Sequence, residues 1–432
     1  MSKSHPQNIA IFFSINYPFH YADSYVDEEV NLWAPQFDKV IIVSLNQDDS
    51  LPRPTPPNAT TLRFRPAIGI AHYFRSIPLL FSGLFRKEVS FVSRGGSGKW
   101  NLGKLKSIFK YYARSLAYRD FLEEKLQSFQ GNQVMVYSYF MLESMLAACS
   151  LKEKYQLKLI SRLHGYDLYF ERGEYGYLPF RGFMAEKIDR LFFISANGLN
   201  YFKQIVLGRN PNLWNKLALS HLGIAPAGDP DLTFRPMNPF TIVSTSWILA
   251  NKRVDLIAKA LSFLPADCRV KWVHFGGAQN IDSDYAGDFL TLVKEVQLNK
   301  KNIEIDLRGN TPKEEIFDFF RNNYVHFFIN VSASEGIPIS MMEASCFGIP
   351  LLGTLVGGVG EIIQDGINGF HLQSNLTPNY LSHQFLRFMQ LDEKEYLELR
   401  KNAYRLWKEN FSSHTNYTQH AKDIASLLAS KS

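Results

Sequence analysis

Residues 332–361 read SASEGIPISMMEASCFGIPLLGTLVGGVGE, and this stretch predicts how the second half of the chain folds. The run before it, residues 325–331 (VHFFINV), is short and apolar, as expected for a buried parallel strand. A Gly-Ile-Pro turn follows, in which Pro338 suits the first position of a helix. Residues 340–347 are then good helix formers, and Gly348 ends the helix. The stretch therefore predicts a strand, a sharp loop and a helix.

Two carboxylates make this loop and helix a candidate binding site. Glu335 lies just before the predicted helix, and Glu343 lies about one and a half turns inside it. The start of a helix offers unpaired backbone N–H groups and a positive dipole end, which together favour a phosphate. An acid beside such a phosphate seat is better suited to accept hydrogen bonds from neighbouring hydroxyls, as on ribose and a sugar. The pattern indicates a nucleotide-sugar site.

Composition limits the class of protein. A chain of 432 residues is long for one core and suits two domains, and its 46% apolar content excludes a disordered protein. The three cysteines, Cys149, Cys268 and Cys346, have neither metal-ligand spacing nor a disulfide framework, which fits a reducing compartment. The first residues lack a signal-peptide pattern, and no apolar run reaches membrane-spanning length. We therefore expect a cytoplasmic protein, possible also as a peripheral one on the inner face of the cell membrane.

Strands alternate with helices along both halves of the chain, which predicts parallel, doubly wound sheets. The strands expected in the first half are residues 8–14, 40–45, 61–65, 134–139, 157–163, 191–195 and 217–222. Those expected in the second half are residues 241–246, 270–275, 303–307 and 325–331. Residues 224–239 hold four prolines and predict a linker. The expected parts are a first domain (1–223), this linker or hinge, a second domain (240–412) and a C-terminal helix (413–432).

The segment FINVSASEGIPISMMEASCFGIPLLGTLVGGVGEII resembles the E-x7-E signature of family 4 glycosyltransferases. Its amino-acid sequence is most similar to that of the bacterial exopolysaccharide branch, of the amylovoran and colanic-acid type. An ordinary strand–turn–helix with two solvated glutamates is the alternative. The strand, the turn, the Gly357-Gly358 pair and Glu361, all in register, favour the family.

The resemblance implies a GT-B fold: two facing Rossmann-like domains, with the C-terminal helix crossing back to the first. It also implies that the first domain binds the acceptor and the second the nucleotide sugar. Transfer would be retaining, from a UDP- or GDP-linked donor, without a metal or other cofactor. The implied product belongs to a surface polysaccharide, built on a lipid-linked acceptor, with no role for nucleic acid.

The resemblance also assigns roles in the second domain. Glu335 would hold hydroxyls of the transferred sugar, and Glu343 those of the ribose. Lys252 matches the family's diphosphate-binding lysine, but Trp247 stands where members carry an arginine, so Arg253 is the candidate for the second positive charge. Contacts to the donor phosphate are assigned to Gly336, Ile337, Pro338 and Ile339 and, more weakly, to Gly276 and Gly277.

The segment His164-Gly165-Tyr166-Asp167 follows an expected strand and matches the family's H-G-x-D. His164 would reach the donor sugar, and Asp167 would either orient the ring or cap the following turn. Residues 16–21 (NYPFHY) occupy the family's loop between donor and acceptor, but they lack its glycine pair, and no residue there is assigned.

Three other patterns are weak. Residues 93–100 (SRGGSGKW) imitate a phosphate loop but lack its first glycine and its final Ser or Thr. No G-x-G-x-x-G follows the first strand, which argues against a dinucleotide oxidoreductase. Asp282-Ser283-Asp284 has the spacing of a metal-binding D-x-D, but it lies in a polar loop and is not expected to bind metal.

Residues 63–119 carry twelve Lys or Arg and one acid, Glu88. Apolar residues of the run IAHYFRSIPLLFSGLFRK are interleaved with these cations, a pattern that suits an anionic membrane surface. A core role for the same residues is the alternative, and single-stranded nucleic acid fits less well because no RNA-binding motif is present.

Together with these patterns, the resemblance implies a retaining hexosyltransferase. A nucleotide-sugar epimerase of the same fold and an inactive module that binds glycan precursors remain as alternatives. The donor sugar, its base, the acceptor, the linkage, the pathway and the oligomeric state are not readable from the sequence.

Overall fold

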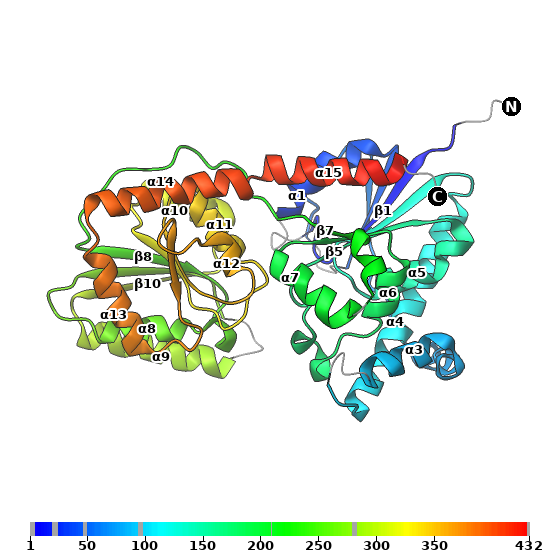
Figure 1. The fold of residues 1–432 in the computed structure, drawn as a ribbon, viewed down its shortest axis with the longest axis horizontal. Coiled ribbons are helices and arrows are strands. Elements are labelled where there is room, and N and C mark those ends of the chain that lie inside the picture. The colour runs from blue at the N-terminus through cyan, green and yellow to red at the C-terminus, as the bar shows by residue number, and fades with distance from the viewer. Residues whose placement is uncertain are drawn as a thin grey trace. The chain divides into compact units, whose positions relative to one another are not determined.

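The computed structural model describes residues 5–19, 25–45, 50–93, 98–208, 210–278 and 283–429, and it divides into two compact units (Figure 1). Unit 1 comprises residues 1–222 together with residues 413–432, and unit 2 comprises residues 223–412. Each unit has its own parallel sheet with helices on both faces. The predicted class, two Rossmann-like α/β units, is confirmed.

The sheet of unit 1 has the strand order β3-β2-β1-β4-β5-β6-β7, and its described pairings are all parallel. Its strands are β1 (Asn8–Ser14), β2 (Lys39–Ser44), β3 (Ala59–Arg63), β4 (Gln133–Ser138), β5 (Lys158–Leu163), β6 (Arg190–Phe193) and β7 (Leu217–Leu219). Its α-helices are α1 (Tyr25–Trp33), α2 (Ile70–Arg75), α3 (Gly83–Phe91), α4 (Leu102–Gln127), α5 (Glu143–Tyr155), α6 (Arg181–Lys187), α7 (Ala196–Tyr201) and α15 (Ser413–Ala429). Shorter or irregular helical turns are η2 (Ala34–Gln36), η3 (Ile77–Phe81), η5 (Phe170–Arg172), η6 (Glu174–Gly176), η7 (Phe202–Leu207) and η8 (Pro211–Lys216).

Alternate side chains of β1 enter two different cores, because successive residues of a strand point to opposite faces. Ile9, Ile11 and Phe13 pack in the core that α4, α5 and α6 cover. Ala10 and Phe12 pack in a second core with residues of α1 and α15. The C-terminal helix therefore completes unit 1, as the GT-B resemblance implied (Figure 1).

A buried polar network attaches α15 to the sheet. The carboxylate of Glu29 accepts a hydrogen bond from Arg162 and from the hydroxyl of Tyr137, and its Oε1 lies 3.1 Å from Nε2 of His420 on α15. Nδ1 of His420 lies 3.2 Å from Oγ of Ser220. The side chains of Glu29, Arg162 and His420 are fully buried. Buried charges are tolerated only when paired, so the network specifies where α15 docks.

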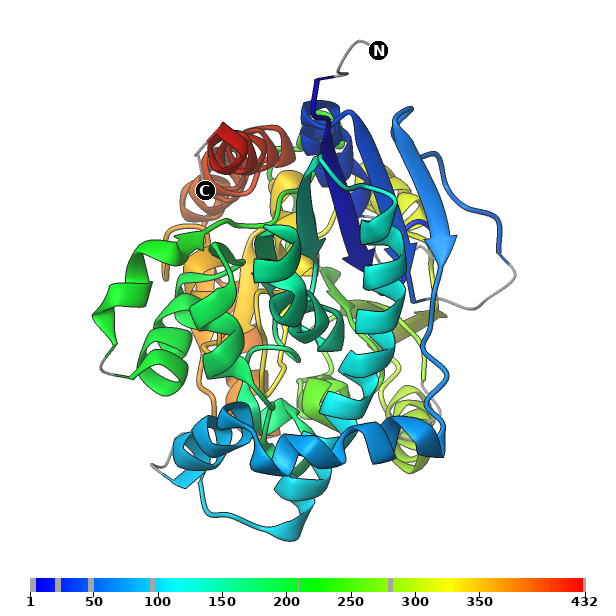
Figure 2. The same cartoon turned by 90° about the vertical axis from the view of Figure 1, so that its right-hand side faces the viewer.

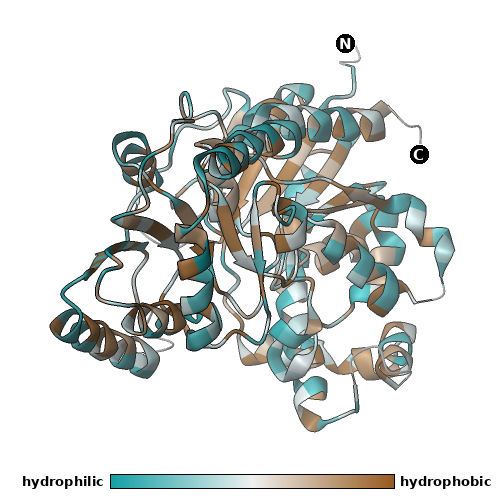
Figure 3. Ribbon diagram, turned by 60° about the vertical axis from the view of Figure 1, so that its left-hand side comes forward, coloured by the Kyte–Doolittle hydropathy of each residue, from teal (hydrophilic) through white to brown (hydrophobic). Residues whose placement is uncertain are grey.

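The sheet of unit 2 has the strand order β10-β9-β8-β11-β12-β13, again with parallel pairings. Its strands are β8 (Phe240–Thr245), β9 (Val270–Phe275), β10 (Ile303–Gly309), β11 (Phe327–Asn330), β12 (Leu351–Thr354) and β13 (Gly369–Leu372). Its helices are η9 (Ala250–Lys252), α8 (Val254–Ser262), α9 (Ser283–Asn299), α10 (Lys313–Asn322), α11 (Ile339–Cys346), α12 (Val359–Ile362), α13 (Pro378–Met389) and α14 (Glu393–Asn410). Most of these strands are largely apolar and the helices have a polar side, as Figure 3 shows, whereas β10 alternates apolar residues with Glu304, Asp306 and Arg308.

The proline-rich residues 224–239 belong to unit 2 in the structure, whereas the sequence predicted a separate hinge. The carbonyl of Asp231 accepts a hydrogen bond from Arg400, and the carbonyl of Thr233 accepts one from Tyr324. Pro236 contributes its carbonyl to the ring of His326, 3.1 Å away. Proline-rich backbone keeps its carbonyls as acceptors, and side chains of unit 2 supply the donors.

Two helical details also differ from prediction. Helix α4 is 26 residues long, but its sequence was interpreted as a basic surface segment. Pro338 was predicted to occupy the first position of a helix, but it is the N-cap residue of α11, which begins one residue later at Ile339. None of the described helices is long and apolar enough to cross a membrane.

Candidate functional site

The strand order of unit 2 reverses between β8 and β11, and a small cavity lies at the carboxyl ends of these two strands. Open α/β sheets bind ligands at such reversal points. Thr245 and Ser246 line the cavity from β8, Asn330 and Ser332 line it from β11, and Lys252 closes it. The hydroxyl of Thr245 is buried and has no hydrogen-bond partner among the described residues.

Lys252 and Glu335 meet at this point although 83 residues separate them. Nζ of Lys252 lies 2.7 Å from Oε1 of Glu335, and the amide of Asn330 donates to the same oxygen over 3.2 Å. Burial alone would raise the pKa of Glu335, but the charge and hydrogen bond of Lys252, with bonds from Ser332 and Asn330, hold it below its usual value. The site therefore presents the ionised carboxylate of Glu335, paired with Lys252, at the reversal point.

The loop that carries Glu335 is held by two glycines of the loop after β12. The N–H of Gly358 donates to the carbonyl of Gly336 over 2.8 Å. A Cβ on Gly357 would lie 1.8 Å from the carbonyl oxygen of Glu335. Only glycine permits this close backbone approach, which explains the Gly357-Gly358 pair in physical terms. Ile337 packs in this loop, and helix α11 begins at Ile339 directly after Pro338.

Glu343 lies within helix α11 and is poorly supplied with donors. Its side chain is 13% exposed, and its ion pair with Lys313 is long, at 3.9 Å. Burial raises the pKa of Glu343 above its usual value, since attraction by Lys313 is too weak to offset it and Glu314 adds repulsion. A buried carboxylate with spare acceptor capacity is suited to receive ligand hydroxyls.

The guanidinium group of Arg253 donates hydrogen bonds to backbone carbonyls. Nε donates to the carbonyl of Val331 over 2.7 Å, Nη1 to that of Ser374 over 2.9 Å and Nη2 to that of Ser332 over 3.1 Å. Its backbone has a φ of 52°, a left-handed conformation that is uncommon outside glycine. These bonds join the start of α8 to the loops after β11 and β13. A phosphate contact by Arg253 stays a prediction.

Gly276 and Gly277 let two loops close on each other. Gly276 has a φ of 126°, and a Cβ there would lie 1.8 Å from the carbonyl oxygen of Ser246. A Cβ on Gly277 would lie 2.6 Å from Oδ1 of Asn310. Close packing of the loops after β8, β9 and β10 thus accounts for both glycines, and their contact with a donor phosphate stays a prediction.

In unit 1, His164 lies after β5 in an aromatic setting, with its ring centroid 4.4 Å from that of Phe140 and 4.8 Å from that of Tyr139. Burial, with repulsion from Arg162, lowers the pKa of His164 to about 3, so the ring is neutral. Neither ring nitrogen has a hydrogen-bond partner among the described residues. Its predicted contact with the donor sugar stays a prediction.

Asp167 resolves one alternative that the sequence left open. Its carboxylate accepts the backbone N–H of His164 over 2.8 Å and that of Met141 over 2.9 Å. It therefore caps the turn, and the imidazole is oriented by aromatic packing.

A cavity lies at the carboxyl ends of β1, β2 and β3, and no sequence pattern predicted it. It has a volume of about 670 Å³, and its polar lining includes Arg65, Arg114, Glu143 and Asn16. Nη1 of Arg114 lies 3.3 Å from Oε1 of Glu143. The two arginines are 49 residues apart on different elements, so no local pattern could pair them.

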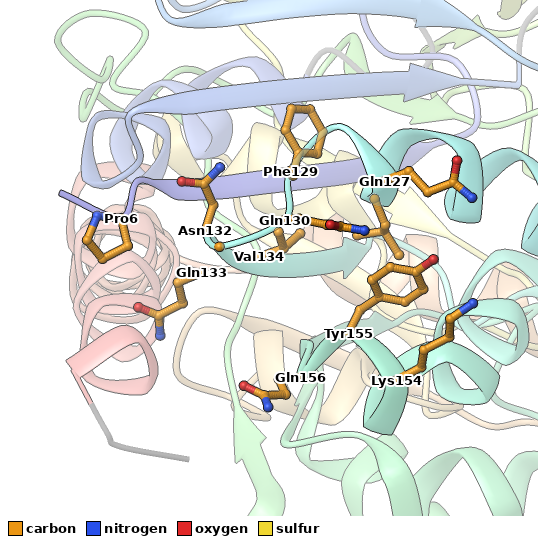
Figure 4. A pocket seen from close by; sticks show the side chains of 12 residues that line it. Pro6, Gln127, Phe129, Gln130, Asn132, Gln133, Val134, Lys154, Tyr155 and Gln156 are labelled. Carbon is orange, nitrogen blue, oxygen red and sulfur yellow. The ribbon is translucent and has the colours of Figure 1, made fainter. Parts of the chain in front are cut away.

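A second cavity of unit 1, of about 820 Å³, lies at the opposite ends of the strands (Figure 4). Its polar lining is mostly side-chain amides, from Gln127, Gln130, Asn132, Gln133 and Gln156. Lys154, the charged residue of this lining, is ion-paired with Glu123. Ligands of open α/β sheets bind at carboxyl ends, so we assign this cavity no function.

The weak patterns of the sequence gain no support. The described part of the phosphate-loop imitation has Ser93 accepting a hydrogen bond from the indole of Trp100, and residues 94–97 lie outside the described residues. Asp282 also lies outside them, while Ser283 and Asp284 form the first turn of α9. The end of the loop 16–21 also lies outside the described residues.

Known proteins resemble both the sequence and the fold. Residues 231–406 match the family described as glycosyl transferases group 1. The putative colanic acid biosynthesis glycosyltransferase WcaL of Escherichia coli K12 is 24% identical over 218 residues, which cover 49% of this chain and 51% of WcaL. A sucrose synthase of Melioribacter roseus is 31% identical over 106 residues, which cover 23% of this chain and 13% of that protein. The matched segments thus span about half or less of these relatives.

Among solved structures, Anabaena HepE in complex with UDP and glucose has a TM-score of 0.65 at 13% identity and covers 96% of this chain and 99% of HepE. Sucrose-phosphate synthase from Thermosynechococcus elongatus has a TM-score of 0.69 at 13% identity, over 98% and 100% of the two chains. Identities this low establish the fold alone.

The fold is that of the GT-B class, and residues 231–406 match the family described as glycosyl transferases group 1. The similarity to WcaL confirms the resemblance to the exopolysaccharide branch.

Proposed function

We propose that this protein is a retaining hexosyltransferase that moves a sugar from a nucleoside-diphosphate donor to a lipid-linked acceptor of a surface polysaccharide. The observation that carries the proposal is the Lys252–Glu335 pair, 2.7 Å apart at the strand reversal of unit 2, within the segment that matches the family. HepE, which shares the fold, has been crystallised with UDP and with UDP-glucose.

The donor would be held by groups of opposite charge. Glu335 would accept hydrogen bonds from hydroxyls of the transferred sugar, and Glu343, with its spare acceptor capacity, those of the ribose. The ammonium of Lys252 would neutralise the diphosphate as the bond to the anomeric carbon breaks. Preorganised charge of this kind stabilises a leaving group in the transition state, and no metal or other cofactor is part of the proposal.

In the transfer, the acceptor oxygen forms a bond to the anomeric carbon as the bond from that carbon to the diphosphate breaks. Attack on the face that the diphosphate leaves retains the configuration, and the departing phosphate takes the acceptor's proton. This stereochemistry comes from the family resemblance.

The acceptor would enter the cavity of unit 1 that Arg65 and Arg114 line. Guanidinium groups bind phosphate oxygens in a planar, bidentate manner, which fits an acceptor joined to its lipid through phosphate. Such an acceptor requires the protein to work at the cytoplasmic face of a membrane.

Transfer to a lipid acceptor, measured with UDP- and GDP-linked sugars, tests the proposal. We expect Glu335→Gln and Lys252→Met to lower transfer by at least about 100-fold, as for loss of one preorganised group. Lys259→Met is the matched control, because Lys259 forms an ion pair of the same 2.7 Å length with Asp255 within helix α8 but has a side chain that is 46% exposed. Full transfer by both site variants would refute the site. A new free nucleotide sugar formed without acceptor would favour an epimerase instead.

A further inference from the structure

Six large apolar side chains of unit 1 are exposed within twelve residues. They come from α2 and η3 and are Ile70, Tyr73, Phe74, Ile77, Leu80 and Phe81, which we call the apolar ledge. Phe81 is 81% exposed, Ile70 76% and Phe74 65%. Helix α2 buries none of its residues. So many exposed apolar side chains on one short segment are uncommon on a soluble protein unless something covers them.

The ledge is held firmly to the rest of unit 1. Arg75 binds Asp120 of α4 through both carboxylate oxygens, at 2.5 and 2.8 Å. Ser76 and Leu79 are buried beneath the ledge, between the exposed residues. In Figures 1 and 2 the blue helices of this region lie at the end of unit 1 opposite the start of β1. The apolar side chains are therefore displayed on a fixed support.

The charge around the ledge is positive. Glu88, the acid in the described part of residues 63–119, is buried and accepts hydrogen bonds from the hydroxyl of Tyr177 and the N–H of Phe180. Arg86, Lys99 and Lys106 are exposed, and among the described residues none of them forms an ion pair within 4 Å. Exposed cations that form no ion pair within 4 Å in the described part of the chain thus lie close in sequence to exposed apolar side chains.

We infer that the apolar ledge inserts into the interfacial layer of an anionic lipid bilayer, with Arg86, Lys99 and Lys106 directed to the headgroups. Apolar side chains at headgroup depth and cations at an anionic surface each add to binding. A protein partner would also accept apolar side chains, but the excess of unpaired positive charge favours a lipid surface.

The position of the ledge connects it to the proposed acceptor cavity. Arg65 and Ile68 line that cavity, and the ledge begins two residues later, at Ile70. A lipid-linked acceptor could therefore keep its lipid in the bilayer while its phosphate reaches Arg65. This connection rests on the proposed function, whereas binding of the ledge to lipid does not.

Flotation with lipid vesicles, using the full chain, tests the inference. We expect binding to phosphatidylcholine vesicles that contain phosphatidylglycerol, weaker binding to phosphatidylcholine alone, and a loss of binding at high salt. Phe74→Ser and Phe81→Ser should each weaken partitioning by about tenfold, because each removes an aromatic side chain from the lipid. Phe263→Ser is the matched control, since Phe263 is 58% exposed on unit 2.

A charge-reversal pair separates the two contributions. Arg86→Glu with Lys106→Glu should abolish the preference for phosphatidylglycerol, whereas Lys301→Glu, at an exposed lysine of unit 2, should not. A wild-type protein that binds neither vesicle at low salt overturns the inference. The inference is also overturned if the wild type self-associates without binding lipid and if Phe74→Ser and Phe81→Ser abolish that self-association.

The outcome is distinguishable from failure of the proposed function. UDP binding, measured by thermal shift, should be the same in the ledge variants as in the wild type, because a bound ligand raises stability by mass action wherever its site is intact. If the protein bound vesicles but not UDP, the inference about the apolar ledge would hold and the proposed donor site would be wrong.

Discussion

Replacing Glu343 by glutamine should make the protein more stable while weakening donor binding. Lys313 lies 3.9 Å from the carboxylate, a distance at which opposite charges attract by about 4 kcal/mol at an effective dielectric of about 20. The pKa of Glu343 is nevertheless raised, which means that burial destabilises the charged form by more than the attraction of Lys313 stabilises it. A neutral amide of the same shape avoids that cost, and we expect the free energy of unfolding to rise by about 1 kcal/mol.

The sign of the pH dependence follows from the raised pKa of the folded state. At a pH below the ordinary value of 4.5, Glu343 is protonated in both the folded and the unfolded chain, and it costs no stability. As the pH rises toward the folded-state pKa, the unfolded chain ionises first, and the wild type loses stability relative to Glu343→Gln. The advantage of the variant should be full at pH 8 and shrink as the pH falls toward 5.

Urea unfolding of both proteins across this pH range measures the advantage, and thermal shift with UDP measures donor binding. Glu315→Gln, at an exposed glutamate of α10, is the control and should change neither quantity. A variant that is less stable than the wild type at pH 8, or whose advantage grows on acidification, would refute the reasoning. UDP binding equal to that of the wild type would remove Glu343 from the donor site.

Three further predictions concern residues whose contacts the structure defines. Arg253→Gly and Arg253→Ala both lose three hydrogen bonds to carbonyls, but only glycine accepts a φ of 52° freely. The free energy of unfolding of the glycine variant should therefore be about 1 kcal/mol higher than that of the alanine variant. Equal urea midpoints for the two variants would contradict this. Burial lowers the pKa of His420, and Arg162 still pairs with Glu29 when the imidazole is removed. His420→Ala should therefore cost about 1–3 kcal/mol in urea unfolding, through lost hydrogen bonds to Glu29 and Ser220, against a loss near zero for exposed His414→Ala. Trp247, 41% exposed on the loop after β8, should change its fluorescence when UDP-glucose binds, and Trp247→Phe should remove that change; an unaltered signal in Trp247→Phe would place the reporter elsewhere.

Most strands were predictable because each is a short apolar run whose position depends on local sequence, but β12 and β13 were not predicted. The predicted run 270–275 coincides with β9, and the predicted run 8–14 coincides with β1. Helix α4 was missed because its cations and aromatic residues alternate too closely for an obvious apolar face. The role of residues 224–239 was also hidden, since the donors that hold them, on Tyr324 and Arg400, are far away in sequence.

The candidate site was predictable only in part. Glu335 and Lys252 were both named from motifs, but the motifs gave no reason for them to touch. Arg253 was predicted to contribute charge to the donor site, which stays a prediction, but its hydrogen bonds to the carbonyls of Val331, Ser332 and Ser374 were not foreseen. Hydrogen bonds between elements distant in sequence leave no local pattern, so these contacts of Arg253 could not be predicted from the sequence.

The sequence alone determined the alternation of strands and helices and the loop that places Glu335 before helix α11, because these depend on neighbouring residues. Tertiary structure alone decided that Lys252 meets Glu335, since β8 and β11 are adjacent at the strand reversal and their carboxyl ends share one edge. It also decided that the Gly357-Gly358 pair clamps the Glu335 loop and that the apolar ledge stays exposed. The physical reason is the same in each case: pairing and burial depend on which segments the sheet order brings together, and that order is a property of the whole chain.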